Sequence, residues 1–253
     1  MKKNILACCA FLVLFTFVYP STGTALDLSA GVYTWYSWWE LPEDQYEDTE
    51  TDPGLVYGPT LAVSFNEFCT MTFVFLYGKF HAEGESSFYV VNSLGPINYY
   101  KYDIERYDSD TAINFKLNNY FKVYLGVKYS AFNYELDGNV ADSDFEHKTF
   151  GPGSGISITI PVAENTFIIG NVGGLYLKGK EKYRDSLAGD SSFDITDYGY
   201  NTSLSLAYFI KPASTTLSLG GRYQYIKTKY DDGFSNNSRF YGVTVSAVYI
   251  FNI

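Results

Sequence analysis

The chain has 253 residues and a formal net charge of −10, and that acidic balance excludes the broad basic surface that nucleic-acid binding requires. Tyr, Phe and Trp make up 19% of the residues, yet the mean hydropathy is only −0.10. Beyond the N-terminal region no apolar run is long enough to cross a membrane as a helix. This combination indicates apolar and polar residues in alternation.

The first 25 residues have the pattern of a secretory signal peptide. Lys2 and Lys3 precede an apolar run at 5–19, and Gly23-Thr24-Ala25 fits a small-x-small cleavage site. We therefore expect residues 1–25 to be removed and residues 26–253 to form one domain. An uncleaved anchor is the alternative, although the run is shorter than the roughly 20 residues that a spanning helix needs. Lipidation is not expected, because Cys8 and Cys9 lie at the start of the apolar run.

Removal of residues 1–25 on export would change both the net charge and the number of cysteines. Without Lys2 and Lys3 the net charge goes from −10 to −12, and only one of the three cysteines, Cys69, remains. One cysteine cannot form an internal disulfide, so the domain must be held together in another way.

Ten segments are strand candidates, and most of them alternate over ten or more residues. This is longer than the strands of most globular proteins and is the length that an oblique crossing of a bilayer needs. They predict a closed antiparallel β-barrel of about ten strands, with eight or twelve as the alternatives. The segments are 26–39, 54–66, 69–82, 103–117, 120–134, 149–161, 166–178, 195–209, 215–229 and 239–253.

The predicted connections alternate between short and long. The short ones lie at 66–68, 118–119, 162–165 and 210–214, and the long polar ones at 40–53, 83–102, 135–148, 179–194 and 230–238. Transmembrane barrels of bacteria have short turns on the periplasmic side and long loops outside. A soluble sandwich has no reason to sort its loops in this way.

The two faces of each strand differ in size and polarity. One face is bulky and apolar, as in Leu55, Tyr57 and Leu61, and the other is small or polar, as in Gly58 and Thr60. For strand 166–178 the sequence does not decide which residues face inward. Aromatic residues also form two bands, one near the long loops and one near the short turns, which is typical of girdles at the two membrane interfaces.

The last segment, YGVTVSAVYIFNI, resembles the closing strand of a bacterial outer-membrane β-barrel. The resemblance implies a place in the Gram-negative envelope among outer-membrane lipid and lipopolysaccharide, with extracellular long loops and periplasmic mature termini. It also implies that the barrel-assembly machinery recognises the chain through Tyr249, Phe251 and Ile253. The family usually ends on an aromatic residue, and this chain ends on Ile253.

Charged residues share the small, polar face of the strands. A charge at the lipid midplane costs roughly 2–4 kcal/mol, so we expect these charges inside the lumen. A three-residue turn at 118–120 predicts Asp110 opposite Lys128 and Asn114 opposite Tyr124. The expected lumen charges are Arg106, Asp108, Asp110, Lys116, Lys122, Lys128 and Arg222.

Three functions remain open at this point. A small porin-like channel comes first, and its five lumen cations against two carboxylates predict a preference for anions. A barrel with a plugged lumen, whose loops bind a surface ligand, is the second. The third is a surface hydrolase similar to the omptin proteases.

We expect no catalytic residue, metal site or cofactor. The only histidines are His81 and His147, and Asp144-Phe145-Glu146-His147 lacks the Asp-x-His spacing of the omptins. The acidic loop at 40–52 has seven carboxylates and no base, but it lacks the spacing of a calcium loop and is expected to be a solvated surface segment.

Overall fold

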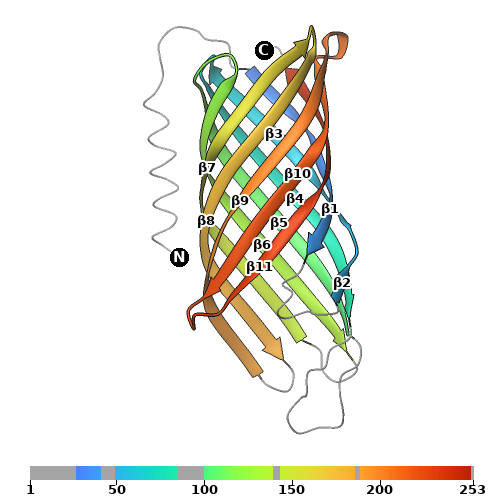
Figure 1. Cartoon of the computed structure of the whole chain (residues 1–253), viewed down its shortest axis with the longest axis vertical. Coiled ribbons are helices and arrows are strands. Elements are labelled where there is room, and N and C mark those ends of the chain that lie inside the picture. The colour runs from blue at the N-terminus through green and yellow to red at the C-terminus, as the bar shows by residue number, and fades with distance from the viewer. Residues whose placement is uncertain (1–26, 41–48, 85–99, 139–142, 186–188, 252–253) are drawn as a thin grey trace.

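The protein is a closed antiparallel barrel in the computed structural model, which describes residues 27–40, 49–84, 100–138, 143–185 and 189–251 (Figure 1). The predicted signal peptide lies outside these residues. Ten strands form the wall, in agreement with the sequence-based prediction. They are β1 (Asp27–Glu40), β3 (Gly54–Asn66), β4 (Cys69–Gly84), β5 (Tyr100–Lys116), β6 (Phe121–Gly138), β7 (Ser143–Ala163), β8 (Thr166–Asp185), β9 (Gly189–Ile210), β10 (Thr215–Tyr230) and β11 (Ser235–Phe251).

The barrel closes between its first and last strands. β1 pairs with β11 from Leu28 opposite Phe251 to Glu40 opposite Arg239, and each other wall strand pairs with its neighbours in sequence. Closure leaves no open edge in the wall, so its backbone N–H and C=O groups can bond to an adjacent strand. Among the described residues no helix is long and apolar enough to cross a membrane.

The strands are longer than the sequence predicted, and three predicted long loops are correspondingly short. β7 has 21 residues and β9 has 22, so most of the predicted loops at 135–148, 179–194 and 230–238 is strand. Alternation continues there with polar outward residues, which hides the strands from a search for apolar faces. A further short strand, β2 (Thr49–Thr51), pairs with β4 within the predicted first loop.

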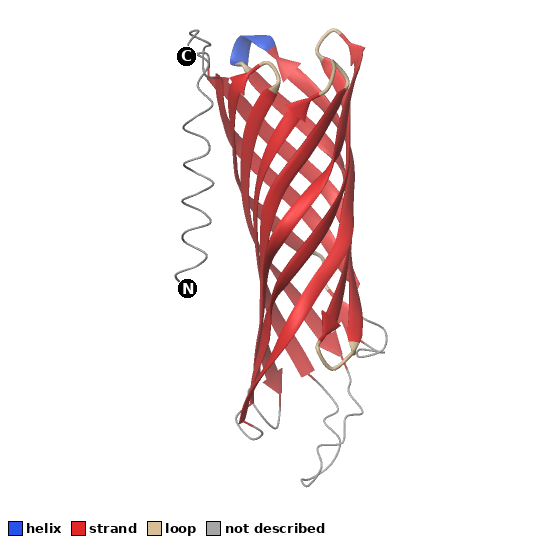
Figure 2. Ribbon diagram, turned by 90° about the vertical axis from the view of Figure 1, so that its left-hand side faces the viewer, coloured by secondary structure: helices blue, strands red, loops and turns tan. Residues whose placement is uncertain are grey.

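The four connections that were predicted to be short lie at one end of the barrel, which we call the turn end, and the other end is the loop end (Figure 2). Two of these turns are closed by an asparagine side chain. Asn66 Oδ1 accepts hydrogen bonds from the backbone N–H of Phe68 and Cys69, at 2.8 and 2.9 Å. Asn118 Oδ1 does the same for Tyr120 and Phe121. The local Asx turns therefore fix the register of β3–β4 and β5–β6.

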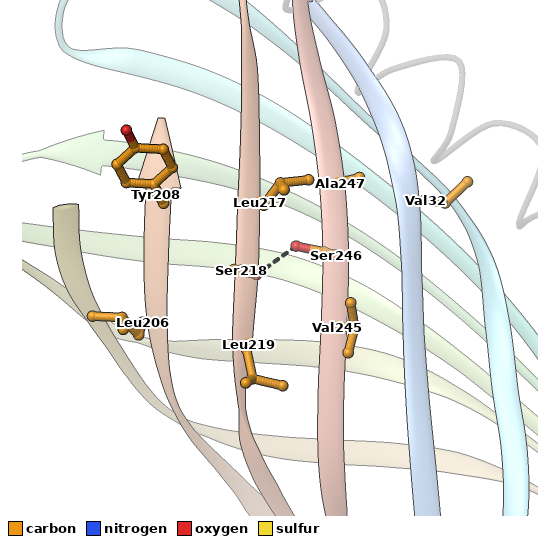
Figure 3. A pocket seen from close by; sticks show the side chains of 9 residues that line it. All are labelled: Val32, Leu206, Tyr208, Leu217, Ser218, Leu219, Val245, Ser246 and Ala247. Carbon is orange, nitrogen blue, oxygen red and sulfur yellow. Dashed lines mark hydrogen bonds between the residues drawn. The ribbon is translucent and has the colours of Figure 1, made fainter. Parts of the chain in front are cut away.

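The outer wall carries an apolar belt. Leu125, Leu204 and Leu219 are each at least 60% exposed, and most bulky outward side chains near them are also exposed. Figure 3 shows Leu206, Leu217, Leu219 and Val245 around a hollow in this wall. The Ser218–Ser246 hydrogen bond drawn there joins residues of the opposite, inward face of β10 and β11. An apolar surface of this extent in water would drive association, so the belt is the part of the wall that faces lipid.

Outward charges mark where the strands leave the lipid at the loop end. Lys79 pairs with Glu105 at 2.8 Å, and Lys180 pairs with Asp194 at 3.2 Å, all on the outer face. Charges at such positions are costly inside a bilayer. The loop-end part of the barrel, from about the level of these pairs, therefore projects beyond the membrane.

A charge placed in the belt tests this division of the wall. We expect Leu219→Arg to lower the free energy of unfolding in lipid vesicles by roughly 2–4 kcal/mol, because the guanidinium would face hydrocarbon. The matched control is Ser192→Arg, an exposed residue of β9 beyond the outward charges. Equal losses in the two variants, measured by denaturant titration, would contradict the proposed belt.

Candidate functional site

The turn-end half of the lumen is lined by small and polar side chains. Ser218 and Ser246 are hydrogen-bonded to each other at 2.6 Å, and Asn171 donates to Ser203 at 3.1 Å. At the mouth is an open cavity of about 300 Å³. Its lining includes Lys116 and Lys122, which lie directly opposite each other on β5 and β6. This half of the barrel is therefore polar and accessible from the turn end.

The loop-end half of the lumen is filled by large apolar side chains. We call five of them the aromatic plug: Trp35, Trp39, Phe80, Phe132 and Phe240, all between 0 and 5% exposed. Their rings pack against one another, with Trp39 stacked on Phe240 at 5.0 Å and Phe132 stacked on Phe240 at 5.9 Å. The plug joins strands from opposite walls, so this half of the lumen is packed like a hydrophobic core.

In strand 166–178, whose inward face the sequence did not decide, the odd-numbered residues face the lumen. Leu175 and Leu177 are buried in the lumen, whereas Val172 and Tyr176 are exposed on the outer wall. These two leucines add apolar volume to the loop-end half.

On the turn-end side of the plug, four charged residues form a group that we call the lumen ion cluster: Arg106, Asp108, Asp110 and Lys128. The Arg106 guanidinium contacts the Asp108 carboxylate at 2.7 Å, and Lys128 reaches Asp108 at 3.0 Å and Asp110 at 3.2 Å. Asp110 lies opposite Lys128 and Asn114 opposite Tyr124, so the predicted register is confirmed. Arg106 and Asp108 have no solvent exposure.

Arg106 is also enclosed by the aromatic plug. Its Cζ lies 4.2 Å from the centre of the Phe240 ring and 5.1 Å from that of Trp35. Its Nη2 donates to Gln224 Oε1 at 2.7 Å from the far side of the lumen. A weakly hydrated guanidinium tolerates such an aromatic setting better than an ammonium would.

The other three predicted lumen charges lie apart from this cluster. Arg222 lies 4.6 Å from the centre of the Trp35 ring, which Arg106 also contacts, but it forms no ion pair with the cluster in the described structure. Lys116 and Lys122 lie at the turn-end mouth. The seven charges therefore do not form one group: four make up the lumen ion cluster, Arg222 lies beside Trp35, and Lys116 and Lys122 form a separate pair at the mouth.

A second buried polar group, missed by the sequence interpretation, surrounds His147 near the loop end. Its Nε2 is 2.9 Å from Asp197 Oδ2 and its Nδ1 is 3.1 Å from Glu181 Oε2. Thr149 and Thr228 donate to the same Asp197 carboxylate at 2.9 and 2.7 Å. We call these five residues the histidine cluster. The strand alternation that continues through 143–163 was the available signal, because it turns His147 inward.

His147 lies between the outward side chains of Glu146 and Lys148, in the part of the barrel beyond the bilayer. Burial alone would lower the pKa of His147. The charge of Asp197 and the hydrogen bonds to Asp197 and Glu181 outweigh that effect and raise the pKa to about 9. The imidazole is therefore a charged partner at neutral pH.

The histidine cluster does not have the geometry of a general base. Both ring nitrogens of His147 contact carboxylates, so neither is free to accept a proton from a substrate or a water. His81 lies elsewhere, exposed on the outer wall beside Asp103. Among the described residues no group of three or more His, Cys, Asp or Glu side chains is arranged to hold a metal ion. The acidic loop at 41–48 lies outside those residues.

No protein-family model matches the sequence, and no curated protein matches it significantly. Solved structures do match the fold. The outer-membrane protease OmpT of Escherichia coli aligns with a TM-score of 0.57 at 9% identity, over 93% of this chain and 100% of that one. The β-domain of the Bordetella autotransporter BrkA aligns at 0.44 with 10% identity, over 91% and 100% of the two chains. The P. putida toluene transporter TodX aligns at 0.41 with 10% identity, over 92% and 91% of the two chains.

A pair of variants tests whether the Arg106–Asp108 contact is a buried ion pair. Arg106→Met should lower the free energy of unfolding by about 3–5 kcal/mol, because it removes the closest cation from a buried carboxylate. Arg106→Met with Asp108→Leu should recover much of that loss, since the uncompensated charge is gone. Denaturant unfolding of the two variants gives the comparison, and a double variant as unstable as the single one would contradict the pairing.

The histidine cluster predicts a stability that falls at alkaline pH. Because the folded pKa of about 9 is above the unfolded value near 6.5, the contribution of His147 is complete below about pH 6.5 and is lost as pH rises through 9. We expect the stability difference between wild type and His147→Gln to shrink between pH 6 and pH 10. Taking the difference cancels the titration of other groups, and a difference independent of pH would exclude a charged His147.

Proposed function

We propose that this chain, a bacterial outer-membrane β-barrel, works with a closed lumen and carries its activity at the loop end, as a surface-binding or structural barrel. The observation that supports this most is the aromatic plug. Trp35, Phe80 and Phe240 have no solvent exposure, and they fill the loop-end half of the lumen, where a pore would need water. A hydrophobic constriction of this kind excludes water and ions.

The orientation in the membrane is part of the proposal. The loop end faces the cell exterior and the turn end faces the periplasm, because bacterial barrels have short periplasmic turns. The extended strands β7, β8 and β9 would then project a rigid wall beyond the lipopolysaccharide-bearing surface. Long strands hold the connecting segments at a fixed place, which suits recognition of a surface ligand.

Assembly is expected to use the closing strand. Tyr249 and Phe251 are exposed on the outer wall near the turn end, with ring centres 4.7 Å apart. Ile253 lies outside the described residues. An aromatic pair on an outward face is accessible to the barrel-assembly machinery before the strand meets β1.

A small anion-preferring channel is the second candidate. The polar turn-end half and the opposed Lys116 and Lys122 at its mouth favour it. Conduction would require the aromatic plug to move, however, because the plug occupies the loop-end half. A surface hydrolase has less support, because the two nitrogens of His147 are both engaged.

Planar-bilayer recording of refolded residues 26–253 separates the two candidates. The closed barrel predicts no steady single-channel conductance. Phe240→Ala should introduce conductance, because it removes the ring at the centre of the plug, and the matched control Tyr241→Ala changes the next, outward-facing ring on the same strand. Heat-modifiable migration on a gel shows that each variant is folded.

Steady conductance of the wild type would overturn the closed barrel and favour the channel. In that case an anion-selective reversal potential would support the excess of lumen cations as its selectivity element.

A further inference from the structure

Four buried side-chain N–H groups inside the lumen find no acceptor within the described part of the chain. They belong to the indoles of Trp35 and Trp39, to Nη1 of Arg106 and to Nε2 of Gln224. A buried donor left without an acceptor destabilises the folded state, because it has given up its hydrogen bond to water. All four groups are donors, and their side chains belong to the aromatic plug or pack against it. This part of the lumen therefore has too few hydrogen-bond acceptors.

Two of the donors are neighbours by covalent geometry. Arg106 Nη2 donates to Gln224 Oε1 at 2.7 Å, so the remaining arm of the guanidinium and the remaining arm of the amide lie beside that bond. Flipping the amide of Gln224 would not help, because it would place an N–H group against the guanidinium. Trp35 completes the group, with its ring centre 5.1 Å from Arg106 Cζ.

The charge of the same region is also unbalanced. Arg106, Arg222 and Lys128 contribute three cations, while Asp108 and Asp110 contribute two carboxylates, and Arg222 has no carboxylate within ion-pair distance in the described structure. Arg106, Asp108 and Lys128 are buried, whereas Arg222 and Asp110 are partly exposed, so the three buried side chains by themselves carry an excess of one positive charge. Such an excess is unfavourable unless a counter-ion is close. An anion that accepts hydrogen bonds would therefore satisfy both the excess positive charge and the unpaired donors.

We propose that the lumen binds one small monoanion of the chloride class, which accepts hydrogen bonds from Arg106 Nη1 and Gln224 Nε2 beside the Trp35 indole. A halide ion accepts hydrogen bonds and donates none, so it can bond to these N–H groups without adding a donor that needs its own partner. A water molecule would bring two O–H groups and no charge. Within the described chain the one buried acceptor that lacks a donor is Asn133 Oδ1, on the outward-facing register of β6.

This site goes beyond the proposed function, because a closed barrel does not require an anion. Its consequence is a dependence of folding on halide concentration. A ligand that binds only the folded state raises stability in proportion to the logarithm of its concentration once that concentration is well above the dissociation constant. The lumen ion cluster and the aromatic plug would then share one counter-ion.

Thermal unfolding of the refolded protein in detergent micelles tests the site. Sodium chloride is compared with sodium gluconate at equal ionic strength, since gluconate is too large for a packed lumen. We expect the unfolding midpoint to rise with the logarithm of chloride concentration. We expect Gln224→Glu to abolish that rise, because its carboxylate supplies a negative acceptor next to Arg106.

The matched control is Asn114→Asp, which adds a carboxylate to the same lumen nearer the turn end of β5. It should keep the dependence on chloride. An equal response to chloride and gluconate in the wild type would overturn the proposal, and so would an undiminished chloride response in a folded Gln224→Glu variant.

Bromide gives a measurement that needs no variant. In wild-type crystals grown with sodium bromide, anomalous scattering should show one peak in contact with Arg106 and Gln224. The absence of a peak there would overturn the proposal even if Gln224→Glu fails to fold, and would leave water as the partner of these donors.

Discussion

A closed sheet in a bilayer gives each wall residue only two environments, lipid or lumen, and the other features of this barrel depend on that constraint. Because the side-chain period of a strand is two, the choice made for one residue of a strand fixes the facing of the rest. Leu219 in lipid therefore requires Arg222, an odd number of residues away, to point into the lumen. When the apolar residues on one face of a strand are exposed to lipid, the charged residues on its other face must therefore lie in the lumen.

The lumen then has to be filled from the same strands, and this chain fills its two halves differently. Glycine and serine dominate the inward face near the turns, while Trp35, Phe80 and Phe240 dominate it toward the loops. The apolar half lies largely beside and beyond the belt, where outward residues such as Lys79 and Lys180 meet water. Above the membrane the barrel is therefore arranged like an ordinary soluble protein, with charges outside and a hydrophobic core inside.

The sequence was sufficient for the fold because barrel architecture depends on local periodicity. Ten alternating segments gave the wall, and the turn at Asn118 gave the register that sets Asp110 opposite Lys128. The sequence was misleading about strand ends, since Lys148 and Glu181 lie in strands whose outward and inward residues are both polar. Where the two faces have similar polarity, alternation of hydropathy cannot distinguish a strand from a loop.

Contacts across the lumen could not be predicted, because they depend on shear and tilt as well as on facing. Arg106 and Gln224 are 118 residues apart in sequence and belong to strands that do not pair, yet they form a hydrogen bond in the barrel interior. The same is true of the plug, in which Trp39 packs against Phe132. Inward facing was the limit of the sequence argument, and it could therefore not decide between a pore and a plug. The aromatic residues of β1, β4, β6 and β11 reach one another across this lumen, and alternation along single strands cannot predict such contacts.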